Sequence, residues 1–200
     1  MDTGQVTAII QAGFLLLAEA TRDVTGDPGA LRARAAECAR CAGQLDTAAG
    51  DTRRTVRQLG QTWLGQAYER TDQDTTNLNN LLVNVLRVAL EQESRRLDSA
   101  ATALTQATNT VEQQRQSFAQ QANSVIQTMA QELARARAMP SPWNKIMMVL
   151  AILKAVQAAL SAKQSAQSAS DATRNQLSNT LATLFATSAT SSGQLTTAGR

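Results

Sequence analysis

The sequence predicts an all-α protein, an elongated antiparallel helical bundle, and three observations support this. Aromatic residues make up only 3% of the 200 residues, whereas a β-sandwich or barrel needs more aromatic and β-branched residues. No glycine lies between Gly65 and Gly193, and the only prolines there are Pro140 and Pro142, so the chain cannot turn as often as a sheet protein must. Apolar residues recur at steps of three and four. We expect one domain over residues 1–186, then a disordered tail over 187–200 that is rich in Ser and Thr.

The first helix is expected over residues 5–22, where apolar residues have helical spacing. The turn that follows contains a signal for a new helix, because Asp27 can cap its N-terminus and Pro28 suits its first position. The second helix is expected over 28–60. Its apolar and small residues form a heptad seam that lets a neighbouring helix approach closely; they are Leu31, Ala35, Cys38, Ala42, Leu45, Ala49, Thr52, Val56, Leu59 and Trp63.

The third helix is expected over 66–138, after a chain reversal at residues 60–65, and Pro140 and Pro142 end it. Its seam contains Tyr68, Leu78, Leu82, Val85, Ala89, Leu97, Leu104, Val111, Phe118, Ala122, Val125, Met129 and Leu133. The fourth helix is expected over 143–186, with a seam of Val149, Ile152, Val156, Ala159, Ala166, Leu177, Leu181 and Leu184. The expected architecture is therefore a long helix-turn-helix hairpin with an additional helix at each end.

The composition excludes most catalytic chemistry. Histidine is absent, so no imidazole can act as a base or a metal ligand. No paired carboxylates, glycine-rich phosphate loop or nucleophile–base set occurs, and we expect no enzyme, no cofactor and no metal. Cys38 and Cys41 cannot close a tetrahedral zinc site within one chain. We expect both to be packing residues; a redox role or a metal shared between subunits is the alternative.

The charge pattern argues against nucleic acid as a partner. The formal net charge of +3 comes from 19 basic and 16 acidic residues, and the basic ones form no dense block. A phosphate-binding face usually requires clustered Lys and Arg. The nearest cluster is Arg53, Arg54 and Arg57, which we interpret as a solvated helix face.

The motif Trp63-Leu64-Gly65 stands at the predicted reversal between two Ala-rich amphipathic helices. Gly65 permits the tight backbone of such a reversal, and Trp63 extends the heptad seam, so that its ring can fill the end of the hairpin or a partner's groove. This arrangement resembles the WxG superfamily associated with type VII (ESX-like) secretion in Gram-positive bacteria, whose members often carry a small residue and an aromatic where Ala67 and Tyr68 stand.

The resemblance covers about residues 27–139, and the additional helices make the layout similar to the longer PPE-type and EspB-like proteins, although the Pro-Pro-Glu signature is missing. It implies a secreted substrate, or the carrier of a larger effector. The implied partner is another WxG-type helical protein or a second copy of the chain, in a hetero- or homo-oligomer.

Type VII substrates usually carry a Tyr-x-x-x-Asp/Glu export signal after the hairpin. Tyr68 and Asp72 match its letters and share a helical face, but they come directly after the turn. The alternative is that Tyr68 packs beneath Trp63 while Asp72 stabilises the N-terminal end of its helix.

Two apolar stretches bear on localisation. Residues 14–18 lack the positively charged flank of a signal peptide, so we expect a chain that is soluble when made and leaves the cell, if at all, by another route. The run 146–162 is shorter than the ~20 residues of a spanning helix. We expect it to form the buried face of the last helix. The alternative is a membrane-active or pore-forming protein that uses Ile146, Val149, Leu150 and Leu153.

Overall fold

The structure, a computed structural model, describes residues 3–24, 26–63 and 65–197, with side chains through residue 186. Throughout this part of the chain the regular secondary structure is helical and no strand occurs, which confirms the all-α prediction. The elements are α1 (Thr3–Val24), α2 (Pro28–Leu59), α3 (Gln66–Asn80), the π-helix η1 (Leu81–Arg87), α4 (Val88–Arg137) and α5 (Trp143–Thr197).

Most helix ends lie within two residues of the expected positions. The exception is α5, which continues to Thr197 instead of ending at residue 186. No proline follows Pro142, so nothing in the sequence forbids the helical backbone there. Of the tail that we expected to be disordered, residues 198–200 lie outside the described residues.

We expected one domain over residues 1–186, but the residue contacts divide the chain into two units. Unit 1 comprises residues 1–26 and 104–179, and unit 2 comprises residues 27–103 and 180–200. The helices α4 and α5 contribute to both. Each unit is described separately.

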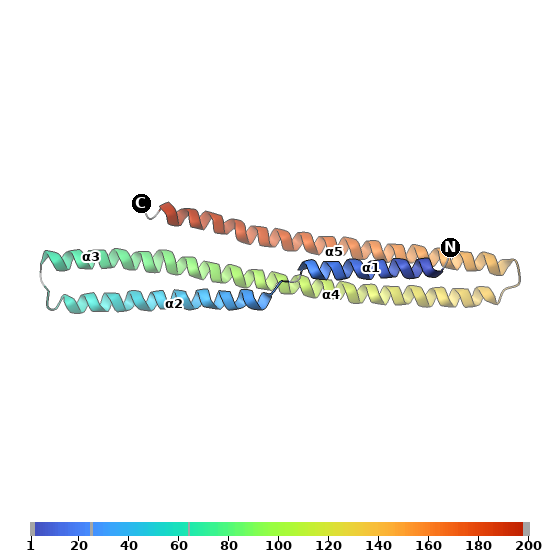
Figure 1. Cartoon of the computed structure of the whole chain (residues 1–200), viewed down its shortest axis with the longest axis horizontal. Helices are drawn as coiled ribbons and strands as arrows, with labels where there is room; N and C mark the ends of the chain where they lie inside the picture. Colours follow the sequence, from blue (N-terminus) through green and yellow to red (C-terminus); the bar gives the residue numbers. More distant parts are fainter. Residues whose placement is uncertain (1–2, 25, 64, 198–200) are drawn as a thin grey trace. The chain divides into compact units, whose positions relative to one another are not determined.

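Unit 1 is a bundle of α1, α4 and α5, which run side by side in Figure 1. On α1, apolar residues at helical spacing are buried, as predicted, and the ring of Phe118 from α4 lies against Gly13. Phe14 meets the same ring edge to face, with 5.0 Å between the ring centroids. The main core cluster contains Val6, Ile10, Leu17, Phe118, Ala122, Ala155, Ala159, Ala162 and Ala166.

Unit 2 is built on α2, which contacts α3 and η1. The Asp27 carboxylate accepts a hydrogen bond of 2.9 Å from the Ala30 amide, and Pro28 occupies the first turn of α2, as predicted. The heptad seam of α2 is also confirmed. Four of its residues, each one heptad apart, are buried; they are Ala35, Ala42, Ala49 and Val56.

The long third helix of the prediction is interrupted by the π-helix η1. Leu78, which we assigned to the seam, is exposed, whereas Asn79 beside it is completely buried. A π-helical turn contains more residues than an α-helical turn. From η1 onward the predicted seam is nonetheless buried or half-buried, for example at Leu82, Val111 and Phe118, so the wrong assignment is confined to Leu78.

Candidate interaction surfaces

The chain reverses between Leu59 and Gln66, and glycines form both ends of the reversal. Gly60 caps α2, and its amide bonds to the Val56 carbonyl. Gly65 has a φ of +106°, and among the described residues it alone has a positive φ. L side chains rarely adopt this conformation, so Gly65 supplies the backbone freedom that the motif requires. Leu64, between Trp63 and Gly65, lies outside the described residues.

The aromatic residues of the motif do not pack as one group. The ring of Tyr68 lies against Gly60, where an added Cβ would be 2.6 Å from its Cζ. Trp63 is 53% exposed, so about half of its surface is open to solvent or to a partner. Asp72 is exposed and lies one helical turn after the half-buried Tyr68. The export signal and the structural role of Tyr68 and Asp72 both stay predictions.

Three large leucines of unit 2 are also exposed: Leu78, Leu81 and Leu86. Leu81 follows Leu78 by three positions at the end of α3, and Leu86 follows Leu81 by five positions through η1. These spacings are close to one α-helical turn and one π-helical turn, so the three side chains share one side of the helix. We call them the leucine face of unit 2.

Asn79 is the one large polar side chain among the most deeply buried residues described. Within the described residues, neither its amide nitrogen nor its oxygen has a hydrogen-bond partner. A buried polar group without a partner destabilises the fold, but in helical interfaces a single buried Asn can fix the register of the helices.

The two cysteines are free and half-buried on α2. Among the described residues, no three Cys, Asp or Glu side chains are grouped so that they could hold a metal ion. The packing, redox and intersubunit-metal roles of Cys38 and Cys41 stay predictions.

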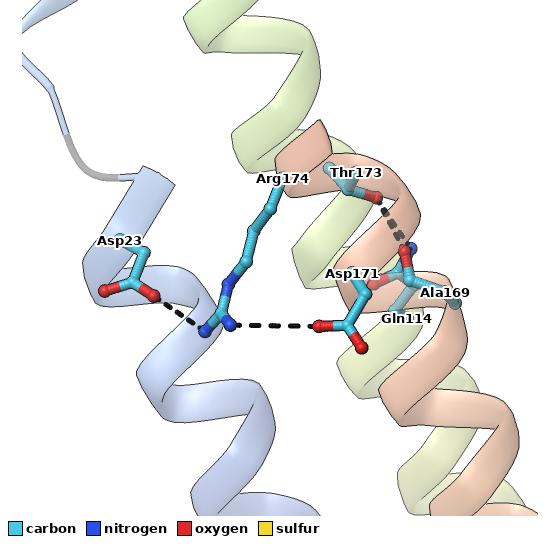
Figure 2. Close-up of polar contacts among 6 residues, drawn as sticks. All are labelled: Asp23, Gln114, Ala169, Asp171, Thr173 and Arg174. Atoms are coloured by element: carbon cyan, nitrogen blue, oxygen red, sulfur yellow. Dashed lines mark hydrogen bonds and ion pairs between the residues drawn. The ribbon is translucent and has the colours of Figure 1, made fainter. Parts of the chain in front are cut away.

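Unit 1 contains a polar cluster where α1 ends beside α5, shown in Figure 2. The Arg174 guanidinium on α5 lies 2.7 Å from the Asp23 carboxylate of α1 and 3.9 Å from Asp171. Beside it, the Gln114 amide of α4 donates to the Ala169 carbonyl at 3.2 Å and to the Thr173 hydroxyl at 3.1 Å. These contacts join all three helices.

In the first half of α5 the predicted seam is buried at Ala159 and half-buried at Ile152 and Val156, but Val149 is exposed. Val156 packs against the core of unit 1. The run 146–162 as a whole does not form the buried face that we expected.

The buried positions of this half of α5 are alanines, including Ala151, Ala155 and Ala159. Its six most exposed large apolar side chains, with Val149 at 58%, do not form the face that packs on α4. We call these residues the apolar α5 face; they are Trp143, Ile146, Val149, Leu150, Leu153 and Leu160.

By length and composition alone, two helical stretches could cross a membrane, one within Thr3–Leu59 and one within Trp143–Ala186. The second contains the run 146–162, which we expected to be too short to span, and the helix around this run extends from Trp143 to Thr197. Core helices of soluble proteins can have the same length and composition, but they are mostly buried. The window in α5, however, is mostly unburied.

No family model matches the chain, and no curated protein or solved structure is similar to it. The resemblance to the WxG superfamily therefore rests on Trp63, Gly65, Tyr68 and the helices around them.

Sequence reasoning missed three features: the buried Asn79, the Arg174 cluster and the outward orientation of the apolar α5 face. The alanines at positions 151, 155, 159, 162 and 166 recur at steps of three and four and were the available signal for the last of these. Small side chains mark the closely packed side of a helix. No sequence signal pointed to the pairing of Arg174 with Asp23, which are far apart in the chain.

Proposed function

We propose that this chain is a type VII secretion-associated protein of the WxG type that acts by helix–helix binding, without a catalytic step. It would be a secreted substrate or the carrier of a larger effector. The leucine face of unit 2, with the exposed Trp63 of the same unit, is the observation that carries this proposal.

The spacing of these residues favours a helical partner. Leucines on one side of a helix fit the groove of an amphipathic helix or hairpin. The neighbouring α2 buries mainly alanines, and such a shallow seam does not cover large side chains on the adjacent helix. A second WxG-type hairpin, or a second copy of the chain, would remove the leucine face from water.

The turn supports the family part of the proposal. Gly65 adopts a backbone conformation that favours glycine, and Gly60 makes room for the ring of Tyr68. Both glycines thus have a physical reason to occur at a helix-to-helix reversal of the WxG type. Trp63 projects from this reversal, where a partner could contact it.

The test is the mass of the purified full chain in solution, alone and co-expressed with a WxG-type neighbouring gene product. We expect a stable oligomer that the triple substitution Leu78→Gln, Leu81→Gln and Leu86→Gln dissociates. The matched control is Leu150→Gln, Leu153→Gln and Leu160→Gln, which changes three exposed leucines of α5. A monodisperse monomer under both conditions would contradict the proposal.

Export is tested separately, as the fraction of the full chain secreted by a host with a type VII system. If Tyr68 and Asp72 form the signal, Asp72→Ala abolishes export without changing the fold, since the carboxylate is exposed. Asp74→Ala, an exposed carboxylate on the same helix, is the control. Equal export of both variants would leave Tyr68 and Asp72 with a structural role only.

A further inference from the structure

Near the connection between α4 and α5, the bundle of unit 1 lacks its third helix, α1. Figure 1 shows that the N-terminal end of α1 does not reach this connection. Val6, near the start of α1, belongs to the core cluster that includes Ala155 of α5. Residues 143–150 of α5 therefore have α4 as their main neighbour, and two helices cannot enclose both sides of α5. This explains why Ile146, Val149 and Leu150 are exposed.

The two sides of α5 differ in shape as well as in burial. Successive residues of an α-helix are rotated by about 100°. The buried alanines therefore follow one side of α5, and the apolar α5 face follows the opposite side. If unit 1 keeps its core, the apolar α5 face can be covered only by something outside this bundle.

The charged residues in and around the apolar α5 face are almost all basic. From Leu133 to Ser170 the sequence contains five cationic residues and no carboxylate; the cations are Arg135, Arg137, Lys145, Lys154 and Lys163. The nearest acidic group is Glu132 on α4, which pairs with Lys154 at 3.5 Å. In the described part of the chain, no carboxylate pairs with Arg135, Arg137 or Lys145, and all three are exposed.

We propose that the apolar α5 face binds an anionic lipid bilayer. Its side chains enter the boundary between headgroups and acyl chains, and the surrounding cations contact the anionic headgroups. Exposed Lys side chains beside an apolar stripe suit this arrangement, because their stems can extend along the lipid while the ammonium groups reach the headgroups. Trp143, 62% exposed at the start of α5, is the residue type enriched at membrane interfaces.

The charge complementarity selects a bilayer over a second copy of the chain. In a symmetric pair, two copies of this region would bring cations against cations, and the one nearby carboxylate, Glu132, already pairs with Lys154. Like charges facing each other disfavour such an interface. Binding to an anionic surface is instead stabilised by about 1 kcal/mol for each Lys or Arg near that surface.

The experiment is flotation of the full chain with lipid vesicles. We expect binding to vesicles that contain phosphatidylglycerol, little binding to pure phosphatidylcholine, and loss of binding at about 1 M salt, where charges are screened within ~3 Å. With Trp63→Phe, Trp143 is the only tryptophan left. Its fluorescence should shift to the blue when vesicles are added.

Two variants separate the apolar and the ionic contributions. Leu150→Gln, Leu153→Gln and Leu160→Gln should abolish flotation, whereas the leucine-face variant of unit 2 should float like the wild type. Arg135→Gln, Arg137→Gln and Lys145→Gln should weaken binding about fivefold per residue. Their control is Arg34→Gln, Arg53→Gln and Arg57→Gln, three exposed cations of α2. Circular dichroism checks that every variant stays helical.

Three results would overturn the proposal. One is a wild-type chain that does not float with phosphatidylglycerol vesicles, or floats equally with phosphatidylcholine. Another is undiminished flotation of the α5 leucine variant. The third is a wild-type oligomer that this variant dissociates, with no flotation, which would make a second copy the occupant of the apolar α5 face.

Discussion

The two units bury different kinds of side chain. Four of the five largest fully buried side chains, Leu17, Val6, Val24 and Val111, lie in unit 1. The fifth, in unit 2, is the polar Asn79. In unit 1, three helices enclose a core that holds large apolar side chains. In unit 2, α2 contacts α3 and η1 mainly through its alanines. We infer that unit 1 carries its own stability and that unit 2 depends more on what covers its leucine face.

The largest expected effect is in the core of unit 1. Phe118→Ala removes a ring that contacts Gly13 and Phe14, and should lower the free energy of unfolding by about 3–5 kcal/mol. Hydrogen-exchange mass spectrometry should locate the loss in α1. Trp143→Ala, at an exposed position, is the control and should leave exchange unchanged. Equal effects of the two variants would show that unit 1 does not depend on this core.

The next comparison uses helical glycines. In Gly13→Ala the new Cβ would overlap the Phe118 ring, so α1 or the ring must move, at a cost of about 1–3 kcal/mol. Gly43 on α2 has no neighbouring atom within 4 Å of such a Cβ, and Gly43→Ala should stabilise unit 2 by about 0.5–1 kcal/mol. Chemical denaturation measures both effects. A stabilising Gly13→Ala would contradict the close packing of α1 on α4.

These glycines also show what the sequence could and could not predict. Helix positions followed from local signals, because Asp27, Pro28, Gly60 and Pro140 act on the backbone beside them. The seam of α2 followed from its regular heptads. The neighbours of Gly13, and the side of α5 that faces α4, depend on helices distant in sequence. Both Ala155 and Val149 fit a helical stripe, and only the packing partners decide which is buried.

Asn79 gives the third test. Asn79→Leu nearly keeps the shape of the side chain and removes two polar atoms that have no partner within the described residues. It should stabilise unit 2 by about 1–3 kcal/mol, measured as slower hydrogen exchange in α3 and η1. Asn80→Leu, an exposed neighbour, is the control. If Asn79→Leu also broadens the range of oligomers in solution, Asn79 fixes the register of the helices at the expense of stability.

A destabilised Asn79→Leu variant, folded and helical, would mean that the amide of Asn79 is satisfied in solution. Water or a partner chain would then have to supply the bond.

The smallest expected effect concerns ion pairs. A double-mutant cycle on Asp23 and Arg174, which join α1 to α5, should give a coupling of about 0.5–1 kcal/mol. The matched pair in unit 2 is Asp51 and Arg54, three residues apart on α2 at 3.1 Å and more exposed to water. Its coupling should be about 0.2–0.5 kcal/mol. The Asp23–Arg174 pair holds two helices together, so its loss should also speed hydrogen exchange at the end of α1. Equal couplings, with no change in exchange there, would show that the core of unit 1 alone sets its register.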